Sequence, residues 1–463
     1  MSLSFCSKPQ AFFFGCVVLL AGCGSEVTPS EYEPSTWVRR LGRNSDSDAV
    51  GLAGFDDGGI VMAGRYYGEV DFGGGKLTSP NDNYQAFVVK YDGTGKHVYS
   101  KSFGDEFAEA ATDVAALPDG SVLVIGTFNW PVDFGTGPIS PLGQDAFVLK
   151  LDASGKTVWV QSFGGEGTQR PAALALTADG GAVIVGTTSG KFDAGIGSVV
   201  DTTSDSFVVR IDSKGKAIWS DVLHSDTGVT INDVAVHAKD GTIAIGGTFY
   251  GQASIGALPD LVANNYQDGF LAAYDDTGKA KWSRAVGGQG YSDSVNAIAM
   301  APKDPTIYAT GQLDYQADLG GGLLGSPDQY DSNTYLLSVS TSGTYQASRL
   351  YGKQNGDTGY GLAVDAQGSV YVAGEFYDRI AFGAVELISK GNSDAYVGKV
   401  APNLDPLFEQ GWGDSERQTA YRVAIDGTGR VYVAGSVFGT VDFGLGPTYG
   451  SGYYETFLLA LPR

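Results

Sequence analysis

The sequence predicts an all-β fold in which seven repeats close into a ring. The composition includes 68 glycines, 12% aromatic and only 18% charged residues over 463 positions, which is typical of short strands joined by tight turns. Three landmark positions recur with a mean spacing of about 61 residues. The two ends of the chain also carry complementary parts of one repeat. Together these observations predict a single β-propeller of four-stranded blades.

The landmarks are a glycine that ends an apolar strand, an aromatic residue in a later strand, and a third, mostly Trp, position. The glycines are Gly64, Gly126, Gly186, Gly247, Gly311, Gly374 and Gly435; the aromatic residues are Phe87, Phe147, Phe207, Phe270, Tyr335, Tyr396 and Phe457; the third positions are Trp37, Tyr99, Trp159, Trp219, Trp282, Ala347 and Phe408. In the six repeats where both occur in order, the third position follows the aromatic residue by 12 residues, whereas the glycine precedes the aromatic residue by 21 to 24 in all seven. Insertions are therefore tolerated between the second and third strands of a repeat.

Each repeat is predicted to contain four strands, A to D. Strands A and B are clearest at residues 361–365 and 369–376, and strands C and D at residues 145–152 and 157–163. Apolar alternation interrupted by Asp, Ser and Gly is the signature of such hairpins.

The chain ends predict how the ring closes. Residues 37–42 form a D strand with no C strand before it, and residues 453–462 form a C strand with no D strand after it. Paired together, they complete a seventh blade and remove the exposed sheet edges, giving 28 strands over residues 36–463. The alternative is a six-repeat propeller with a stray N-terminal strand, which the complementary ends disfavour.

The N-terminus has the features of an export signal: Lys8, an apolar run over residues 11–20, and small residues after it. The sequence from Leu20 to Cys23 resembles the lipobox of bacterial lipoproteins. This resemblance implies a signal peptide over residues 1–22, cleavage before Cys23, and lipidation of Cys23 that anchors the protein to a membrane. Residues 23–35 are predicted to be a flexible tether, and Gly24 favours the outer membrane. An ordinary secretory signal is the alternative.

The remaining composition limits the chemistry of the mature chain. Cys6 and Cys16 lie inside the predicted signal peptide, so no disulfide is expected. A formal net charge of −22 argues against nucleic acid as a partner. We expect no cofactor.

Two segments, residues 361–376 and 423–435, resemble the seven-bladed β-propeller repeat family found in bacterial surface proteins, and are also similar to the NHL repeat. The resemblance covers residues 36–463 and implies the fold. Residues 152–159 resemble the docking motif of quinoprotein propellers with a spacing one residue short. An activity does not follow, because one fold supports many functions.

A candidate binding face follows from the topology. The B–C and D–A connections share one face of a propeller, and we expect the longer B–C loops to converge there around the axis. Unrepeated residues just after the B-strand glycine can stack on sugars or grip a peptide. These candidates are Tyr67, Asn129, Trp130, Tyr250, Asp314, Tyr315, Tyr377, Asp378 and Phe438. The alternative is that the aromatic rings pack between blades.

Metal and catalytic signals are weak. The acids that recur after the B glycine and at the start of strand C are explained by turn and strand-end hydrogen bonds; they are Asp71, Asp133, Asp193, Asp318 and Asp442, and Asp145, Asp205, Asp268 and Asp394. Residues 81–83 (Asn-Asp-Asn) lack the spacing of a calcium loop. His97, His224 and His237 lack the spacing of a zinc site.

The sequence therefore favours an envelope-anchored, non-enzymatic propeller that binds or scaffolds a protein or glycan. The alternative is a propeller enzyme, such as a polysaccharide hydrolase or lyase or a quinoprotein-like enzyme, with carboxylates near the axis. That alternative requires at least two acids in one pocket with perturbed pKa values.

Overall fold

The computed structural model describes residues 36–42, 47–80, 83–104, 107–197, 199–325, 331–352, 356–383 and 385–462. The chain divides into two compact units, Met1–Glu33 and Pro34–Arg463, and all described residues belong to the second. The predictions for residues 1–22, for Cys23, for the tether and for residues 81–82 fall outside the described ranges. Within those ranges, no helix has the length and apolar character needed to cross a membrane.

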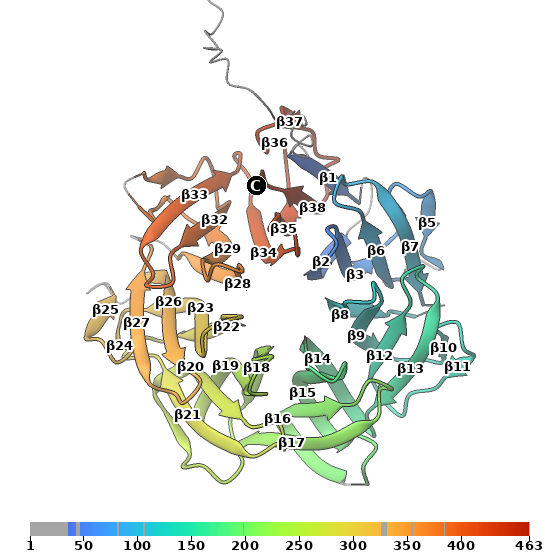
Figure 1. Ribbon diagram of the computed structural model, residues 1–463, viewed down its shortest axis with the longest axis horizontal. Coiled ribbons are helices and arrows are strands. Elements are labelled where there is room, and N and C mark those ends of the chain that lie inside the picture. Colours follow the sequence, from blue (N-terminus) through green and yellow to red (C-terminus); the bar gives the residue numbers. More distant parts are fainter. Residues whose placement is uncertain are drawn as a thin grey trace, which may run out of the picture. The chain divides into compact units, whose positions relative to one another are not determined.

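The second unit is an all-β ring of seven four-stranded antiparallel blades, which confirms the predicted fold class (Figure 1). Two residue pairs join the third and fourth blades into one eight-stranded sheet. In chain order, the strands of the first six blades are β2 (Ser47–Gly54), β3 (Ile60–Tyr66), β6 (Gln85–Tyr91) and β7 (His97–Phe103); β8 (Ala110–Ala116), β9 (Val122–Phe128), β12 (Asp145–Leu151) and β13 (Thr157–Phe163); β14 (Gly167–Leu176), β15 (Ala182–Asp193), β16 (Val199–Ile211) and β17 (Ala217–Ser225); β18 (Val229–Val236), β19 (Ile243–Ser254), β20 (Leu261–Tyr274) and β21 (Ala280–Val286); β22 (Ser294–Met300), β23 (Thr306–Asp314), β26 (Ser332–Ser340) and β27 (Tyr345–Leu350); β28 (Thr358–Val364), β29 (Val370–Phe376), β32 (Asp394–Val400) and β33 (Pro406–Trp412).

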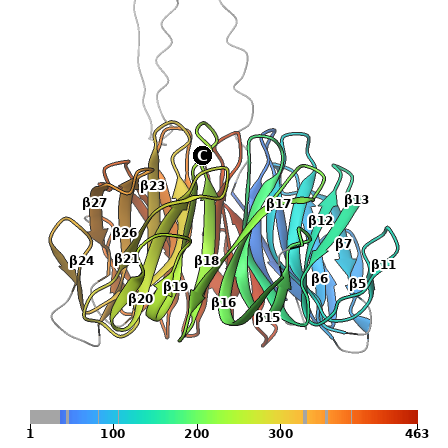
Figure 2. The ribbon, with the colours of Figure 1, turned by 90° about the horizontal axis from the view of Figure 1, so that it is seen from below.

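The seventh blade joins both ends of the chain, as predicted. Its strands are β34 (Gln418–Ile425), β35 (Val431–Val437), β38 (Glu455–Ala460) and β1 (Trp37–Leu41). Strand β1 pairs antiparallel with β38, with Trp37 opposite Ala460 and Leu41 opposite Thr456. The A strands lie around the axis, and the blade strands run between the two faces of the ring (Figure 2).

The core is divided among the contacts between blades. The described residues form seven apolar clusters, and each spans one pair of neighbouring blades, including the pair formed by the seventh and first. The B strands are covered on both sides by neighbouring blades, so β9, β29 and β35 are buried at every position. Burial on both faces explains why these strands are continuous apolar runs rather than alternating ones.

The recurring B-strand glycine faces a β-bulge in the A strand of the same blade. In the first blade Ala49 pairs with Gly64 and Gly51 pairs with Ala63, which leaves Val50 as the extra residue. The other six blades have a bulge at the equivalent place. At all seven glycines, a Cβ atom would lie 1.9–2.2 Å from a backbone oxygen of the A strand. Only glycine permits this approach.

The recurring Trp position in strand D covers the C–D turn of the next blade. A Cβ atom at the turn glycine would come within 2.6–2.8 Å of the covering ring in five pairs, namely Gly95 with Trp37, Gly155 with Tyr99, Gly215 with Trp159, Gly278 with Trp219 and Gly343 with Trp282. In the next pair the ring is replaced by Ala347, and the turn glycine is replaced by Leu404, which is buried, adopts φ +67° and packs in the same cluster. Leu404 thus fills the space that an aromatic ring fills elsewhere.

A buried ion pair accompanies the closing strand. The Arg40 guanidinium of β1 donates to the Glu455 carboxylate of β38 and, at 2.9 Å, to the Thr448 carbonyl oxygen; the two charged side chains are only 4% and 0% exposed. Removing one partner of a buried pair leaves the other charge without compensation in a low-dielectric site.

We therefore expect Arg40→Ala to lower the free energy of unfolding by about 3 kcal/mol or more. The matched control is Lys76→Ala, which removes an exposed ion pair with Glu69 and should lower the free energy of unfolding far less, because solvent screens exposed pairs. Chemical denaturation of both variants measures the difference. Equal costs would show that closure does not depend on this pair.

Candidate functional site

The longer B–C connections do not converge around the axis, and that prediction is wrong. In five blades they form small two-stranded hairpins, and the hairpins labelled in Figure 1 lie at the outer rim. These hairpins are β4 (Glu69–Asp71) with β5 (Lys76–Thr78), β10 (Val132–Asp133) with β11 (Pro138–Ile139), β24 (Gln316–Asp318) with β25 (Leu323–Gly325), β30 (Arg379–Ile380) with β31 (Leu387–Ile388), and β36 (Val441–Asp442) with β37 (Pro447–Thr448). In the third and fourth blades, the B and C strands are longer instead.

Packing of the hairpin explains this outward direction. Phe72 follows Asp71 and lies 4.5 Å from the C-strand ring of Phe87, measured between ring centroids. The same contact recurs for Phe134 with Phe147, at 4.6 Å. The Asp71 carboxylate accepts hydrogen bonds from the Gly73 and Gly75 N–H groups at 2.7 and 3.1 Å. Asp133, Asp318 and Asp442 form the same pair of bonds, which confirms the prediction that these acids hold turns.

The predicted aromatic residues remain close to the blades, and several pair with a second ring. We define the aromatic arc as three ring pairs on adjacent blades: Phe438 with Tyr454 (5.2 Å), Tyr67 with Tyr84 (5.7 Å), and Trp130 with Phe107 (4.3 Å, stacked at 16°). Trp130 is 51% exposed and Tyr454 is 49% exposed. The pair of Tyr250 with Tyr266 (5.3 Å) belongs to the fourth blade, outside the arc.

A pocket of about 280 Å³ opens between the seventh and first blades of the arc. It is lined by Asp48, Tyr84, Arg417, Tyr421, Ser436 and Tyr454. Arg65 lies 4.5 Å above the Tyr84 ring and pairs with Asp48 at 2.9 Å. Aromatic rings, both signs of charge and hydroxyl groups thus meet at one opening.

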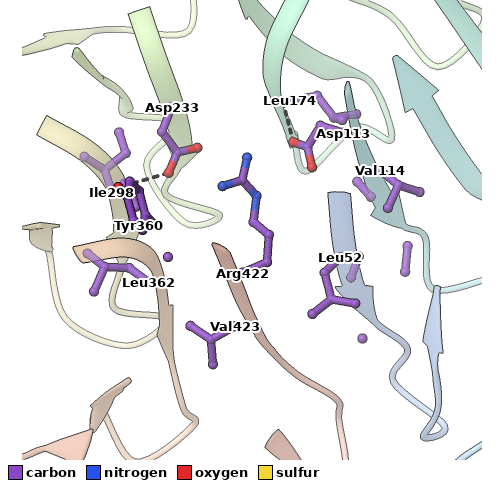
Figure 3. A pocket seen from close by; sticks show the side chains of 16 residues that line it. Leu52, Asp113, Val114, Leu174, Asp233, Ile298, Tyr360, Leu362, Arg422 and Val423 are labelled. Carbon is purple, nitrogen blue, oxygen red and sulfur yellow. Dashed lines mark hydrogen bonds between the residues drawn. The ribbon is translucent and has the colours of Figure 1, made fainter. Parts of the chain in front are cut away.

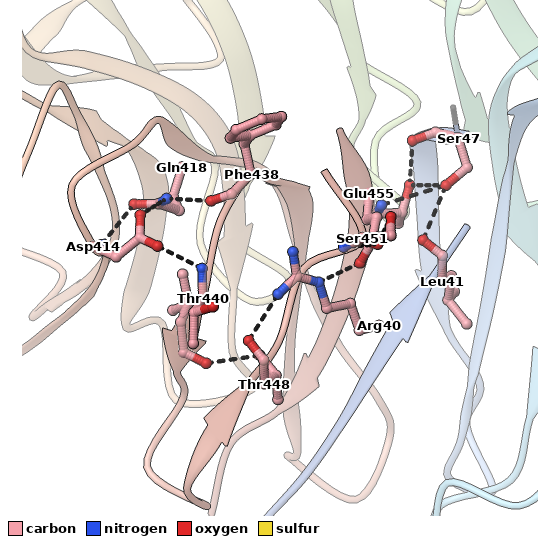
Figure 4. A network of polar contacts seen from close by, with 12 residues as sticks. Arg40, Leu41, Ser47, Asp414, Gln418, Phe438, Thr440, Thr448, Ser451 and Glu455 are labelled. Atoms are coloured by element: carbon pink, nitrogen blue, oxygen red, sulfur yellow. Dashed lines mark hydrogen bonds and ion pairs between the residues drawn. The ribbon is translucent and has the colours of Figure 1, made fainter. Parts of the chain in front are cut away.

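Polar contacts behind the arc fix the position of Phe438 (Figure 4). The Gln418 amide donates to the Phe438 carbonyl oxygen at 2.8 Å and to the Asp414 carboxylate at 2.7 Å. That carboxylate also accepts a hydrogen bond from the Thr440 N–H, two residues after Phe438. The B–C connection of the seventh blade is therefore tied to the loop that leads into β34.

The other predicted residues differ in accessibility. Asp314 is buried, and its carboxylate accepts a hydrogen bond from the Tyr291 N–H at 3.0 Å, so it braces a loop rather than facing solvent. Asn129 is half-buried and donates to the Ala108 carbonyl oxygen at 3.4 Å. Tyr315 and Tyr377 are half-buried, and Asp378 is exposed.

Tyr315 and Asp378 have backbone conformations that normally favour glycine. Both occupy the fourth position after the B glycine, with φ +61° and +50°. Glycine holds this position with positive φ in four other blades, at Gly68, Gly190, Gly251 and Gly439. In the second blade the position is Trp130, which precedes Pro131 and is therefore held in extended backbone. A non-glycine residue in this region costs about 1 kcal/mol.

The axial cavity contains charged residues that the sequence analysis did not select. It has a volume of about 320 Å³ and is lined by the A strands, with Asp113 from β8, Asp233 from β18 and Arg422 from β34 pointing into it (Figure 3). Asp113 accepts a hydrogen bond from the Leu174 N–H at 3.0 Å, and Asp233 accepts one from the Ile298 N–H at 2.8 Å. Each carboxylate therefore also contacts the next blade.

Burial changes the ionisation of both acids. It raises the pKa of Asp113 to about 7, although the Arg422 charge and backbone N–H groups act in the opposite direction. It raises the pKa of Asp233 to about 6. Burial also raises the pKa of Tyr360, which lines the cavity and donates to Glu375 at 3.0 Å. The Asp113 and Asp233 side chains are half-buried by surface area, because they face the cavity.

Three residues of the cavity were missed because they sit inside apparently regular strands. A comparison of equivalent positions in the seven repeats would have identified them. Asp113, Asp233 and Arg422 occupy a position where the other four blades carry Gly or Ala. Among the described residues, no group of three or more His, Cys, Asp or Glu side chains is placed to hold a metal ion.

Comparisons with known proteins give distant similarities. No family model matches the chain. The regulatory protein FlaEY of Caulobacter vibrioides is 23% identical over 210 residues, which cover 43% of this chain but only 22% of that protein.

Three solved structures are similar at low identity. They are the Neurospora crassa Pan2 WD40 domain (11% identity, TM-score 0.46, 94% of this chain and 98% of that chain), Kuenenia stuttgartiensis hydrazine synthase (14%, 0.37, 64% and 74%) and a gluconolactonase from Xanthomonas campestris (14%, 0.33, 73% and 90%).

Strain at the fourth position predicts the effect of restoring glycine there. We expect Asp378→Gly to raise the free energy of unfolding by about 0.5 to 1 kcal/mol, because glycine adopts positive φ without a steric penalty. The opposite change at the equivalent position, Gly251→Ala, should lower it by about 1 kcal/mol. Urea denaturation measures the free energy of unfolding of both variants. If Asp378→Gly is less stable than the parent protein, the backbone of Asp378 is not strained.

The raised pKa values predict how stability depends on pH. Between pH 4 and 7 the folded protein retains protons on Asp113 and Asp233 that the unfolded chain has released, so ionisation of these groups reduces stability as pH rises through this window. Each group contributes at most about 1.4 kcal/mol per pH unit. Denaturation of Asp113→Asn/Asp233→Asn should therefore show a flatter pH profile than the parent protein.

The control for this profile is Asp133→Asn. Hydrogen bonds from the Gly135 and Gly137 N–H groups lower the pKa of this exposed carboxyl, so it is ionised in both states above pH 5. Its effect on stability should not vary between pH 5 and 8. A parent profile unchanged by the double substitution would contradict burial as the cause.

Proposed function

We propose that this chain is a cell-envelope lipoprotein whose propeller binds a partner protein through the aromatic arc. The observation that carries the proposal is the gathering of six aromatic side chains on three adjacent blades, where Trp130, Tyr67, Phe107 and Tyr454 are each more than a third exposed. Exposed apolar patches of this kind mark interaction surfaces in soluble domains.

The composition of the arc favours a protein partner over a glycan. Trp, Tyr and Arg dominate the energetically important contacts of protein interfaces, and Arg65 and Arg417 accompany the rings here. The Trp130 and Phe107 rings stack on each other, which leaves only one face of each ring for a sugar. The anchoring part of the proposal rests on residues 8–23, whose order of Lys, apolar run and Leu-Ala-Gly-Cys resembles a lipoprotein signal. Outer-membrane placement is part of the same proposal.

A propeller enzyme is the second candidate, and one observation favours it. Asp113 and Asp233 are two carboxyl groups in one cavity with raised pKa values, which is the arrangement an acid–base mechanism requires. It ranks second because the backbone hydrogen bonds that both carboxylates accept from a neighbouring blade favour their ionised form, whereas a general acid must hold a proton.

Site-specific crosslinking in cells tests partner binding. A photo-crosslinking amino acid in place of Trp130 or Tyr454 should capture one specific protein, whereas the same probe in place of Val158, an exposed residue of the outer strand β13, should not. With the probe at Tyr454, Trp130→Ala should reduce capture at least tenfold, as expected for a central aromatic contact.

Thermal unfolding of Trp130→Ala provides the control, with an expected change of a few degrees, on the order of 1 kcal/mol. If the substitution instead destabilises the fold strongly and leaves capture unchanged, the ring serves packing between blades. Capture of glycan without protein would replace the protein partner with a glycan.

A further inference from the structure

The seven A-strand bulges bring one residue from each blade to the same level of the axis. These residues directly follow the bulge: Gly51, Asp113, Ala173, Asp233, Ala297, Gly361 and Arg422. Four are Gly or Ala and three are charged. The next position is apolar in all seven blades, with Leu52, Val114, Leu174, Val234, Ile298, Leu362 and Val423.

The three charged residues are not needed to hold the blades together. Asp113 and Asp233 do accept hydrogen bonds from the next blade, but the other five blades pack in the ring without a carboxylate at this position. At Gly51 a Cβ atom would lie 2.7 Å from the Val114 backbone nitrogen, so the framework itself favours a small residue. Three charges at one level of one cavity are therefore a specific departure from the repeat.

The cavity offers both donors and acceptors for hydrogen bonds. The Arg422 guanidinium has five N–H groups, and its contact in the structure is with the Tyr421 carbonyl oxygen at 3.2 Å. Among the described residues, no carboxylate forms an ion pair with it. Asp113 and Asp233 accept backbone hydrogen bonds and retain further lone pairs.

The balance of charge indicates the class of ligand. At pH 7 one guanidinium faces one carboxyl group that is about half protonated, Asp113, and one that is mostly ionised, Asp233, so the net charge of the site is less than one unit. This small net charge disfavours a simple anion or cation. A hydroxyl group both donates to a carboxylate and accepts from a guanidinium. The apolar side chains of Leu52, Leu362 and Val423 provide a surface for C–H groups.

We propose that the axial cavity binds a small, neutral, polyhydroxylated ligand of monosaccharide size, held by Arg422, Asp113 and Asp233. The volume of about 320 Å³ is at the lower end of the range for small-molecule sites. This site is separate from the aromatic arc, and it does not depend on partner binding there.

Ligand-observed NMR on the purified protein tests the proposal with glucose, galactose and mannose as probes. At least one of these sugars should receive saturation from the protein at millimolar concentration. Arg422→Gln, which keeps a polar side chain but loses the charged planar fork, should weaken binding about tenfold or more. Asp113→Asn should also weaken it, because one acceptor becomes a donor.

The matched control is Ala297→Gly, a change at the same level of the cavity that should leave binding unaltered. Circular dichroism and thermal unfolding verify that each variant is folded, and Arg422→Lys replaces Arg422→Gln if the latter is not. Galacturonic acid and glucosamine are the charged probes. The proposal is overturned if no neutral sugar binds, if a charged sugar binds much more tightly, or if the folded Arg422 variant binds like the parent.

Discussion

The close approach of each A strand to the glycine of strand B is the constraint on which the rest of the ring depends. A side chain at Gly64 or its six equivalents would collide with a backbone oxygen, so glycine and bulge occur together in every blade. The bulge adds one residue to the inner strand and increases its twist. It also turns the following side chain toward the axis, where Asp113, Asp233 and Arg422 line the cavity. The geometry that builds the blade therefore also creates the axial site.

Repetition explains how much of the fold could be predicted. Gly64 and Phe87 were identifiable because their spacing recurs, and the pairing of β1 with β38 followed from incomplete repeats at the two ends. Exceptions to the repeat can be equally informative. Ala347 alone looks like the loss of the covering ring. Leu404 in the adjacent turn fills the same space, and this packing explains why a leucine adopts a positive φ there. Tyr315 and Asp378 have no such structural explanation, so they remain candidates for function.

The direction of the B–C hairpins could not be predicted from spacing alone. Loop length sets the reach of a connection but not its direction. Here one recurring contact, the ring of Phe72 or its equivalents against the C-strand aromatic residue, holds the start of the hairpin against the blade. The partners of the predicted rings were missed for a related reason. Tyr84, Phe107 and Tyr454 lie far from Tyr67, Trp130 and Phe438 in the repeat pattern, and only the fold brings them together.

The polar contacts behind the arc limit how a ligand can be recognised. Glu375 is buried and accepts hydrogen bonds from Arg417 at 3.0 and 2.8 Å, from Thr419 at 2.9 Å and from Tyr360 at 3.0 Å. Moving the Arg417 guanidinium away would remove two of the hydrogen bonds that this buried carboxylate accepts and its cationic partner, which disfavours such a movement. Arg417 therefore acts as a fixed part of the pocket wall, and the proposed partner would have to fit its position. Because Arg417 lines the arc pocket and Tyr360 lines the axial cavity, the same carboxylate fixes one wall of each site.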